Sequence, residues 1–85
     1  MTSRATPGFW ACYNELPAPI QQLARKKFAL WKENPLHPSL KFKPIHLPMW
    51  SVRVGDHFRA VGHFVGGVFL WHWIGTHEEY NKRFG

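Results

Sequence analysis

Four prolines stand between residues 35 and 48, in the stretch NPLHPSLKFKPIHLP, and they divide the chain into two parts with different periodicity. Proline cannot continue a helix and cannot donate to a sheet, so this stretch predicts an irregular connector with one short edge strand, LKFK. Apolar residues recur every three or four positions before the connector and alternate after it. Helices followed by strands are typical of an α+β fold.

Two helices are expected before the connector, over about residues 9–33. FWACYNEL follows Pro7 and ends at Pro17, and APIQQLARKKFALWKEN follows in turn. The second segment carries apolar residues at helical spacing, which predicts one buried stripe. The stripe consists of Ile20, Leu23, Ala24, Phe28 and Trp31.

Three strands are expected after the connector. The stretch from Trp50 to Val54 alternates, Gly55 and Asp56 supply a turn, HFRAVGHFV follows, and two glycines precede VFLWHWI. Such a pattern predicts an antiparallel meander. We therefore expect one domain over residues 1–85, with two amino-terminal helices on one face of a small twisted antiparallel sheet over about residues 40–75. The other sheet face would be left open, and a short carboxy-terminal tail would follow.

Two arginines are expected to lie together on the open face. If Val52 and Val54 face the helices, strand alternation places Arg53 on the other side, and Arg59 joins it across the hairpin. A pair of guanidinium groups can bind phosphate oxygens in pairs, which predicts a phosphate site. The alternative is that each arginine lies over a Trp or pairs with a carboxylate such as Asp56. The spacing alone leaves both interpretations open.

His77 and Tyr80 follow the last strand, where side chains at a sheet rim can reach a ligand on the open face. If the tail makes one helical turn, the two side chains share a side, and the histidine could transfer a proton near neutral pH. The alternative is structural, with the histidine at a strand end and the ring packed on the sheet. Further candidates for nucleic-acid contacts are Lys41, Lys43, His57 and His63.

Net charge predicts an anionic partner. Lys and Arg number 11 against 5 Asp and Glu, and six His add charge below neutral pH. Nucleic acid, an acidic protein and an anionic membrane all fit, as does solubility alone. The single cysteine, Cys12, favours a reducing compartment, and the cytoplasm is the expected location. We expect no signal peptide and no membrane segment. We also expect no metal site and no cofactor, since no HxH, HExxH or phosphate-loop spacing occurs.

The segments WSVRVGDHFRAVGHF and FLWHWIGTHEEY resemble the carboxy-terminal half of RelE/ParE-type toxins of bacterial type II toxin-antitoxin systems. The order of elements is also similar, and the likeness covers about residues 9–83. Within that family the chain is most similar to the mRNA interferase branch that includes RelE, YoeB and YafQ. The resemblance implies a metal-independent endoribonuclease that cuts mRNA on the ribosome by attack of the ribose 2′-hydroxyl.

The resemblance also implies roles for individual residues. Arg53 and Arg59 would hold the scissile phosphate, His77 would act as general acid or base, and Tyr80 would orient or stack on a base. Lys41 and Lys43 would bind the RNA backbone. The implied partners are a cognate antitoxin, the ribosome and mRNA, with no membrane and no small-molecule cofactor.

Two departures from the family pattern are visible. Ser51 stands where the best-known members carry a lysine, and the start at Pro7 leaves little room for the amino-terminal strand that many members have. Members of the ParE branch keep the fold yet inhibit DNA gyrase without ribonuclease residues. A gyrase inhibitor and an inactive antitoxin-binding member are therefore alternative expectations.

Overall fold

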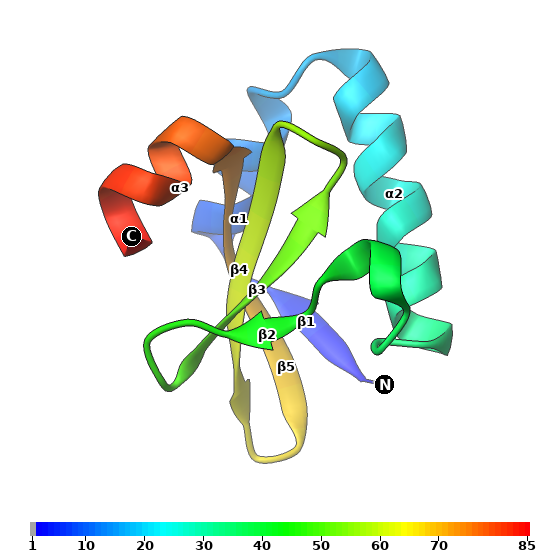
Figure 1. Ribbon diagram of the computed structural model, residues 1–85, viewed down its shortest axis with the longest axis vertical. Helices are drawn as coiled ribbons and strands as arrows, with labels where there is room; N and C mark the ends of the chain where they lie inside the picture. The colour runs from blue at the N-terminus through cyan, green and yellow to red at the C-terminus, as the bar shows by residue number, and fades with distance from the viewer. Residues whose placement is uncertain (1) are drawn as a thin grey trace.

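The computed structural model describes residues 2–85 and has an α+β fold, as expected (Figure 1). In chain order the elements are β1 (Ser3–Ala5), α1 (Pro7–Asn14), α2 (Ala18–Glu33), the 3-10 helix η1 (Pro38–Leu40), β2 (Lys43–Pro44), β3 (Met49–Val54), β4 (Phe58–Val65), β5 (Val68–Thr76) and α3 (His77–Phe84). The strands form one sheet in the order β1-β5-β4-β3-β2.

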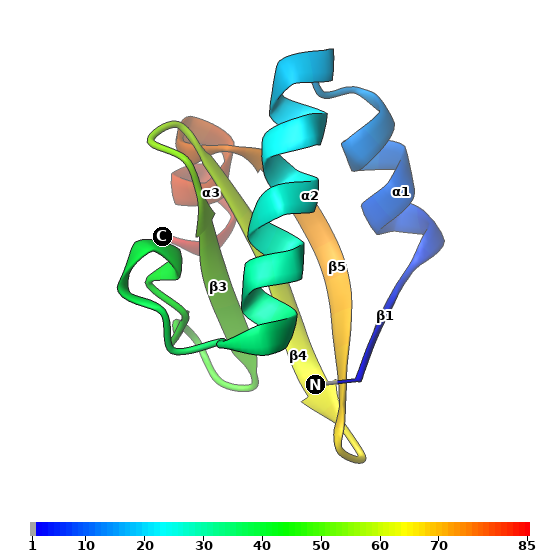
Figure 2. The ribbon, with the colours of Figure 1, turned by 90° about the vertical axis from the view of Figure 1, so that its right-hand side faces the viewer.

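Helices α1 and α2 confirm the two predicted amino-terminal helices and lie on one face of the sheet (Figure 2). Helix α1 begins where the Thr6 hydroxyl accepts a hydrogen bond from the backbone N–H of Phe9, at 3.1 Å. Pro7 suits the first helical position, where no backbone donor is needed. Helix α2 ends at Glu33, two residues before Pro35.

The antiparallel meander of β3, β4 and β5 is confirmed, but two other features of the sheet differ from expectation. A short amino-terminal strand does exist, because Ser3–Ala5 pairs in parallel with Phe69–Trp71, so the sheet is mixed. The predicted edge strand LKFK is largely wrong. Leu40 ends η1, Lys41 has a left-handed backbone with φ of 45°, and β2 begins only at Lys43.

The core lies between the sheet and the two amino-terminal helices. Trp31 of α2 is fully buried, and its ring centroid lies 5.0 Å from that of Trp71 and 5.2 Å from that of Phe69. Val52 and Val54 face this core, as alternation predicted. A small chain needs such aromatic contacts because its buried surface is limited.

A bulge in β5 changes which side chains reach each sheet face. Trp71 pairs with Gly62 and Trp73 pairs with the preceding residue, Val61, so His72 is an extra residue on β5. Trp71 therefore packs in the core, whereas Trp73 lies on the opposite face, where its ring is 5.5 Å from that of Phe84. Strict alternation would have put both tryptophans on the same face.

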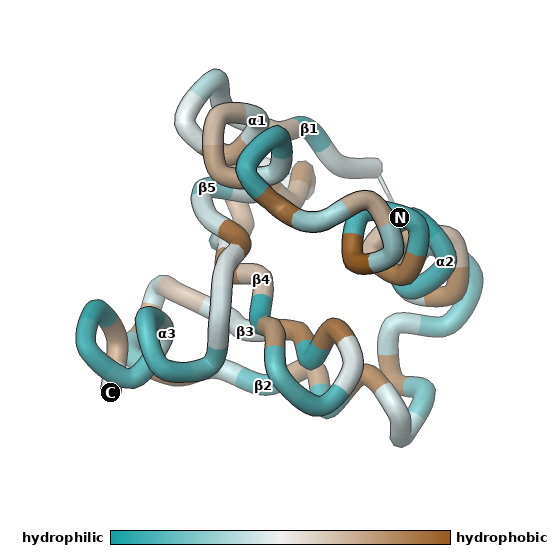
Figure 3. Tube along the Cα trace, turned by 90° about the horizontal axis from the view of Figure 1, so that it is seen from above, coloured by the Kyte–Doolittle hydropathy of each residue, from teal (hydrophilic) through white to brown (hydrophobic). Residues whose placement is uncertain are grey.

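We call the face away from α1 and α2 the outer face, and α3 covers part of it (Figure 3). The sheet face that was expected to be open is therefore partly covered, and the tail is a helix of eight residues. Thr76 and Glu79 form a capping box that starts α3, since the Thr76 hydroxyl accepts from the Glu79 N–H at 3.1 Å. Beneath α3, Trp73 is only 5% exposed. Within residues 2–85, no helix is both long and apolar enough to cross a bilayer.

Candidate functional site

Arg53 and Arg59 lie directly opposite each other on β3 and β4, and both face outward, as alternation predicted. Opposed residues of antiparallel strands have Cα atoms about 4.5–5.5 Å apart, so two like charges meet at this point. The Arg53 guanidinium donates to the Asp56 carboxylate at 2.6 Å and to the Gly55 carbonyl at 3.1 Å. One of the two predicted arginines is thus held by Asp56, a carboxylate that is itself 79% exposed.

Arg59, unlike Arg53, has no ion pair with a carboxylate among the described residues. Burial, followed by repulsion from Arg53, lowers the pKa of Arg59, while Tyr80 and Asp56 act in the opposite direction. The only side-chain hydrogen bond described for Arg59 within residues 2–85 runs from Nη1 to the Phe58 carbonyl, at 2.9 Å. A partly desolvated guanidinium without a carboxylate partner favours an anionic ligand, because the ligand restores the lost stabilisation of the charge.

His77 and Tyr80 lie in the first turn of α3, beside the arginine pair. Their rings are nearly parallel, with centroids 6.0 Å apart, so they share a side as predicted. The backbone N–H of His77 donates to the His57 carbonyl at 2.8 Å and fixes the start of α3 against the hairpin between β3 and β4. The Nδ1 atom of His77 is buried and has no hydrogen-bond partner among the described residues. Buried polar atoms are nearly always hydrogen-bonded, so this nitrogen stands out as unsatisfied in the free protein.

The remaining predicted residues fall in different places. Lys43 lies on β2 opposite Ser51, which puts it on the outer face. Lys41 follows η1 and is exposed, and His57 is exposed in the hairpin between β3 and β4. His63 faces outward on β4, where its ring is hydrogen-bonded to that of His72. His72 was not among the predicted residues, although it follows core-facing Trp71 and so faces outward by alternation.

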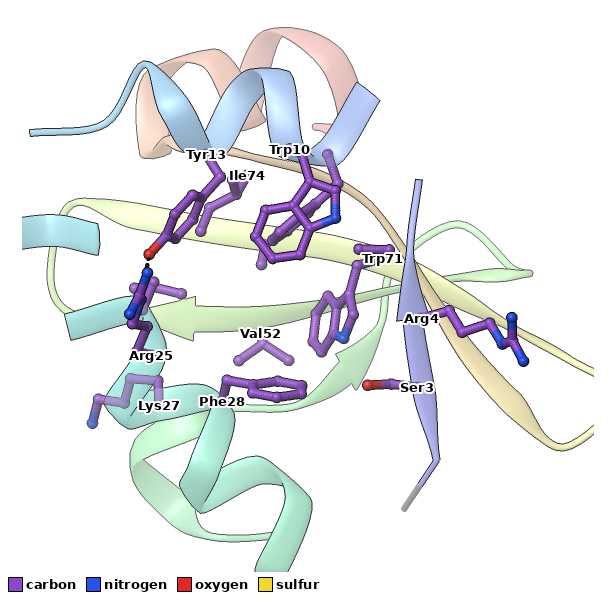
Figure 4. A pocket seen from close by; sticks show the side chains of 15 residues that line it. Ser3, Arg4, Trp10, Tyr13, Arg25, Lys27, Phe28, Val52, Trp71 and Ile74 are labelled. Atoms are coloured by element: carbon purple, nitrogen blue, oxygen red, sulfur yellow. Dashed lines mark hydrogen bonds between the residues drawn. The ribbon is translucent and has the colours of Figure 1, made fainter. Parts of the chain in front are cut away.

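An apolar groove opens on the other side of the sheet, between α1, α2 and β1 (Figure 4). Its volume is about 290 Å³, and its floor includes Val52 and Trp71. Trp10 of α1 and Phe28 of α2 line it while remaining 50% and 41% exposed. Exposed large aromatic side chains that line one concave apolar surface are typical of an interaction site. The charged residues that line the groove are all basic, namely Arg4, Arg25 and Lys27, and of these Arg4 points its side chain away from the groove (Figure 4).

The comparisons with known proteins include one matching family model. The family model described as the ParE-like toxin domain matches residues 18–82. None of the curated proteins compared with the chain matches it. Within residues 2–85, no group of three or more His, Cys, Asp or Glu side chains is arranged as metal ligands would be.

Several solved structures share the fold at low sequence identity. The YoeB/ParE toxin from Agrobacterium tumefaciens has a TM-score of 0.70 at 18% identity, over 91% of this chain and 99% of that one. In the RelB-RelE antitoxin-toxin complex from Methanococcus jannaschii, the matching chain has a TM-score of 0.74 at 14% identity, over 95% and 98%. A chain of the toxin-antitoxin complex RelBE2 from Mycobacterium tuberculosis has a TM-score of 0.67 at 20% identity, over 88% and 95%.

Proposed function

We propose that this chain, which belongs to the ParE-like toxin family of toxin-antitoxin systems, is an endoribonuclease that cuts mRNA on the ribosome without a metal ion. The observation that carries the proposal is the position of Arg59. Its guanidinium lies opposite Arg53, within the electrostatic influence of Tyr80, and has no carboxylate partner among the described contacts. A scissile phosphate at this point would meet two cations from the sheet and two proton-carrying side chains from α3.

The proposed reaction uses the neighbouring ribose as the nucleophile. The 2′-oxygen forms a bond to phosphorus, the bond from phosphorus to the 5′-oxygen breaks, and negative charge grows on the non-bridging oxygens. Arg53 and Arg59 would stabilise that charge, which is the largest contribution a preorganised site can make. A proton must leave the 2′-hydroxyl and another must reach the 5′-oxygen. His77 is suited to one of these transfers because imidazole titrates near neutral pH.

Asp56 would regulate access to Arg53 in this scheme. In the free protein its carboxylate occupies the guanidinium that the phosphate needs. An exposed ion pair of this kind contributes at most about 1 kcal/mol, so an RNA phosphate can displace the carboxylate. The hairpin would then present both arginines to the same ligand.

A second candidate function is non-enzymatic inhibition of DNA gyrase. Ser51 favours it, because this outer-face position, where the best-known ribonucleases of the family carry a lysine, is here a serine that is only 2% exposed. The two functions are separated by a supercoiling assay with purified gyrase and no ribosomes. The ribonuclease proposal predicts unchanged supercoiling in that assay and arrested translation in a ribosome-containing extract. Inhibited supercoiling with normal translation would reverse the assignment.

The cognate antitoxin is the proposed protein partner, and the apolar groove is its proposed docking surface. Exposed Trp10 and Phe28 would receive apolar side chains, and the basic rim would receive acidic ones. The excess of 11 Lys and Arg over 5 Asp and Glu also favours an acidic partner. The groove and the arginine pair lie on opposite sheet faces. An antitoxin that fills the groove must therefore extend round the molecule, or act at a distance, to block the arginines.

Replacing Trp10 should weaken antitoxin binding more than replacing other exposed apolar residues. We expect Trp10→Ala to raise the dissociation constant about tenfold to a hundredfold, because exposed tryptophans in concave sites are frequent binding hot spots. Isothermal titration calorimetry with the cognate antitoxin measures the change. Leu36→Ala is the matched control, since Leu36 is 80% exposed and does not line the groove. Equal affinities for the two variants would place the antitoxin elsewhere.

A further inference from the structure

His63 and His72 form a pair of imidazole rings on the outer face. The ring planes are parallel within 3°, their centroids are 4.5 Å apart, and Nε2 of His72 is hydrogen-bonded to Nδ1 of His63. One proton therefore lies between these two ring nitrogens. His72 faces outward because it follows Trp71, which packs in the core, and it is the extra residue of the bulge in β5.

The number of protons on the pair decides what it can bind. When both rings are neutral, one proton lies in the bridge, so the two outer nitrogens are one donor and one acceptor. These atoms are Nε2 of His63 and Nδ1 of His72. One additional proton keeps the bridge, turns both outer nitrogens into donors and gives the pair a positive charge. A second additional proton would break the bridge, since two N–H groups would then face each other. The singly protonated pair is thus suited to an oxyanion.

The surroundings of the pair contain cations and lack carboxylates. Arg4 of β1 lies opposite Leu70, which in turn lies opposite His63, so Arg4 is on the same face. Figure 4 shows Arg4 pointing away from the apolar groove. Met49 of β3 is the other neighbour of His63 and carries no charge. The five strands described for residues 2–85 contain no Asp or Glu.

The pair is also aligned with the arginine site. Arg59 and His63 both face outward on β4 and are four residues apart, which corresponds to about 13 Å along a strand. Burial, followed by repulsion from His63, lowers the pKa of His72. A bound anion would oppose both effects, because it compensates the charge that an added proton brings. Proton uptake and anion binding must then promote each other.

We propose that His63 and His72 form a phosphate subsite for the RNA backbone that becomes active on taking up one proton. The subsite rests on the proposed ribonuclease function, in which it would hold a phosphate beside the one between Arg53 and Arg59. Arg4 adds a second cation at its edge. No direct contact with the scissile bond is involved, so the pair positions the strand and takes no part in bond cleavage.

The test is the pH dependence of oligonucleotide binding. Fluorescence anisotropy with a labelled single-stranded DNA oligonucleotide avoids cleavage, because the 2′-hydroxyl is missing. At constant ionic strength, we expect the affinity of the wild type to rise between pH 7.5 and 5.5 about tenfold more than that of His63→Gln/His72→Gln. The single variant His72→Gln should behave like the double variant. His37→Asn is the matched control, since asparagine can still accept from the Ser39 N–H, and it should keep the wild-type rise.

The outcomes separate the subsite from the enzymatic proposal. An equal rise with pH in the wild type and in folded variants, checked by circular dichroism, would overturn the subsite whether or not the protein cleaves RNA. Imidazole NMR signals that respond to inorganic phosphate without any pH-linked oligonucleotide binding would assign the pair to a free anion and also overturn the proposal. A wild type that binds in this way but never cuts mRNA would retain the subsite and refute only the ribonuclease function.

Discussion

Arg59→Ala is expected to reduce mRNA cleavage by about a hundredfold to a thousandfold, the usual effect of removing one preorganised donor from a developing oxyanion. Of the two arginines in the pair, Arg59 has no carboxylate partner among the described contacts. Its loss leaves the phosphate with Arg53 alone. Arg53 must first leave Asp56 before it can bind the phosphate. The measurement is the rate of cleavage of a translated message in a ribosome-containing extract, under single-turnover conditions.

Two control variants make the result specific. Arg59→Lys should recover part of the activity, because lysine keeps the charge but cannot bind two oxygens with a planar fork. Lys26→Ala removes the same unit of charge from an exposed position on α2, outside the site, and should leave the rate within about twofold of the wild type. If Arg59→Ala and Lys26→Ala cleaved equally fast, the arginine would have no special part in the chemistry.

Trp31→Ala is expected to lower the free energy of unfolding by about 3–5 kcal/mol, the range for removing a large aromatic side chain from a core. Trp31 has no exposed surface, and its ring also contacts those of Phe28 and Phe42, with centroids 6.2 Å and 5.9 Å away. It is the buried residue of α2 and contacts the sheet through Phe69 and Trp71. A loss of this size is a large part of the stability of any small domain, so the variant should be close to unfolding.

Urea denaturation followed by circular dichroism measures this effect. Trp10→Ala is the matched control, since Trp10 is 50% exposed and should cost only about 1 kcal/mol. The same control shows that a change in antitoxin binding by Trp10→Ala does not come from unfolding. A cost below about 1.5 kcal/mol for Trp31→Ala would mean that α2 is held to the sheet by other contacts.

The sequence allowed the central part of the fold to be predicted. Alternation in β3 and β4 was sufficient to place Arg53 and Arg59 on the same face, whereas their direct pairing follows from a turn of three residues, 55–57, in place of the expected Gly55-Asp56 turn. The start of the helix in the tail could also have been predicted from the sequence. Thr76 and Glu79 stand in the S/T-x-x-E spacing of a capping box, which signals the helix start that the structure shows.

Other features could not be predicted from local patterns. Strand β1 has only three residues, and its pairing with β5 depends on the position of the whole sheet. The bulge that turns Trp73 out of the core breaks the alternation from which side-chain directions are inferred. The apolar groove depends on how α1 and α2 are placed over the sheet, so Phe28 appeared from its spacing to be core although it is 41% exposed.

The measurement that tests the proposed function most directly is a map of mRNA 5′ ends in cells that produce the wild type or His77→Ala. His77 lies beside Tyr80, and its Nδ1 has no partner among the described residues. We predict new 5′ ends within translated reading frames for the wild type, and at least about a hundredfold fewer for His77→Ala at equal protein level. Identical maps for the two proteins, or a wild type that arrests growth without producing new ends, would contradict the ribonuclease function.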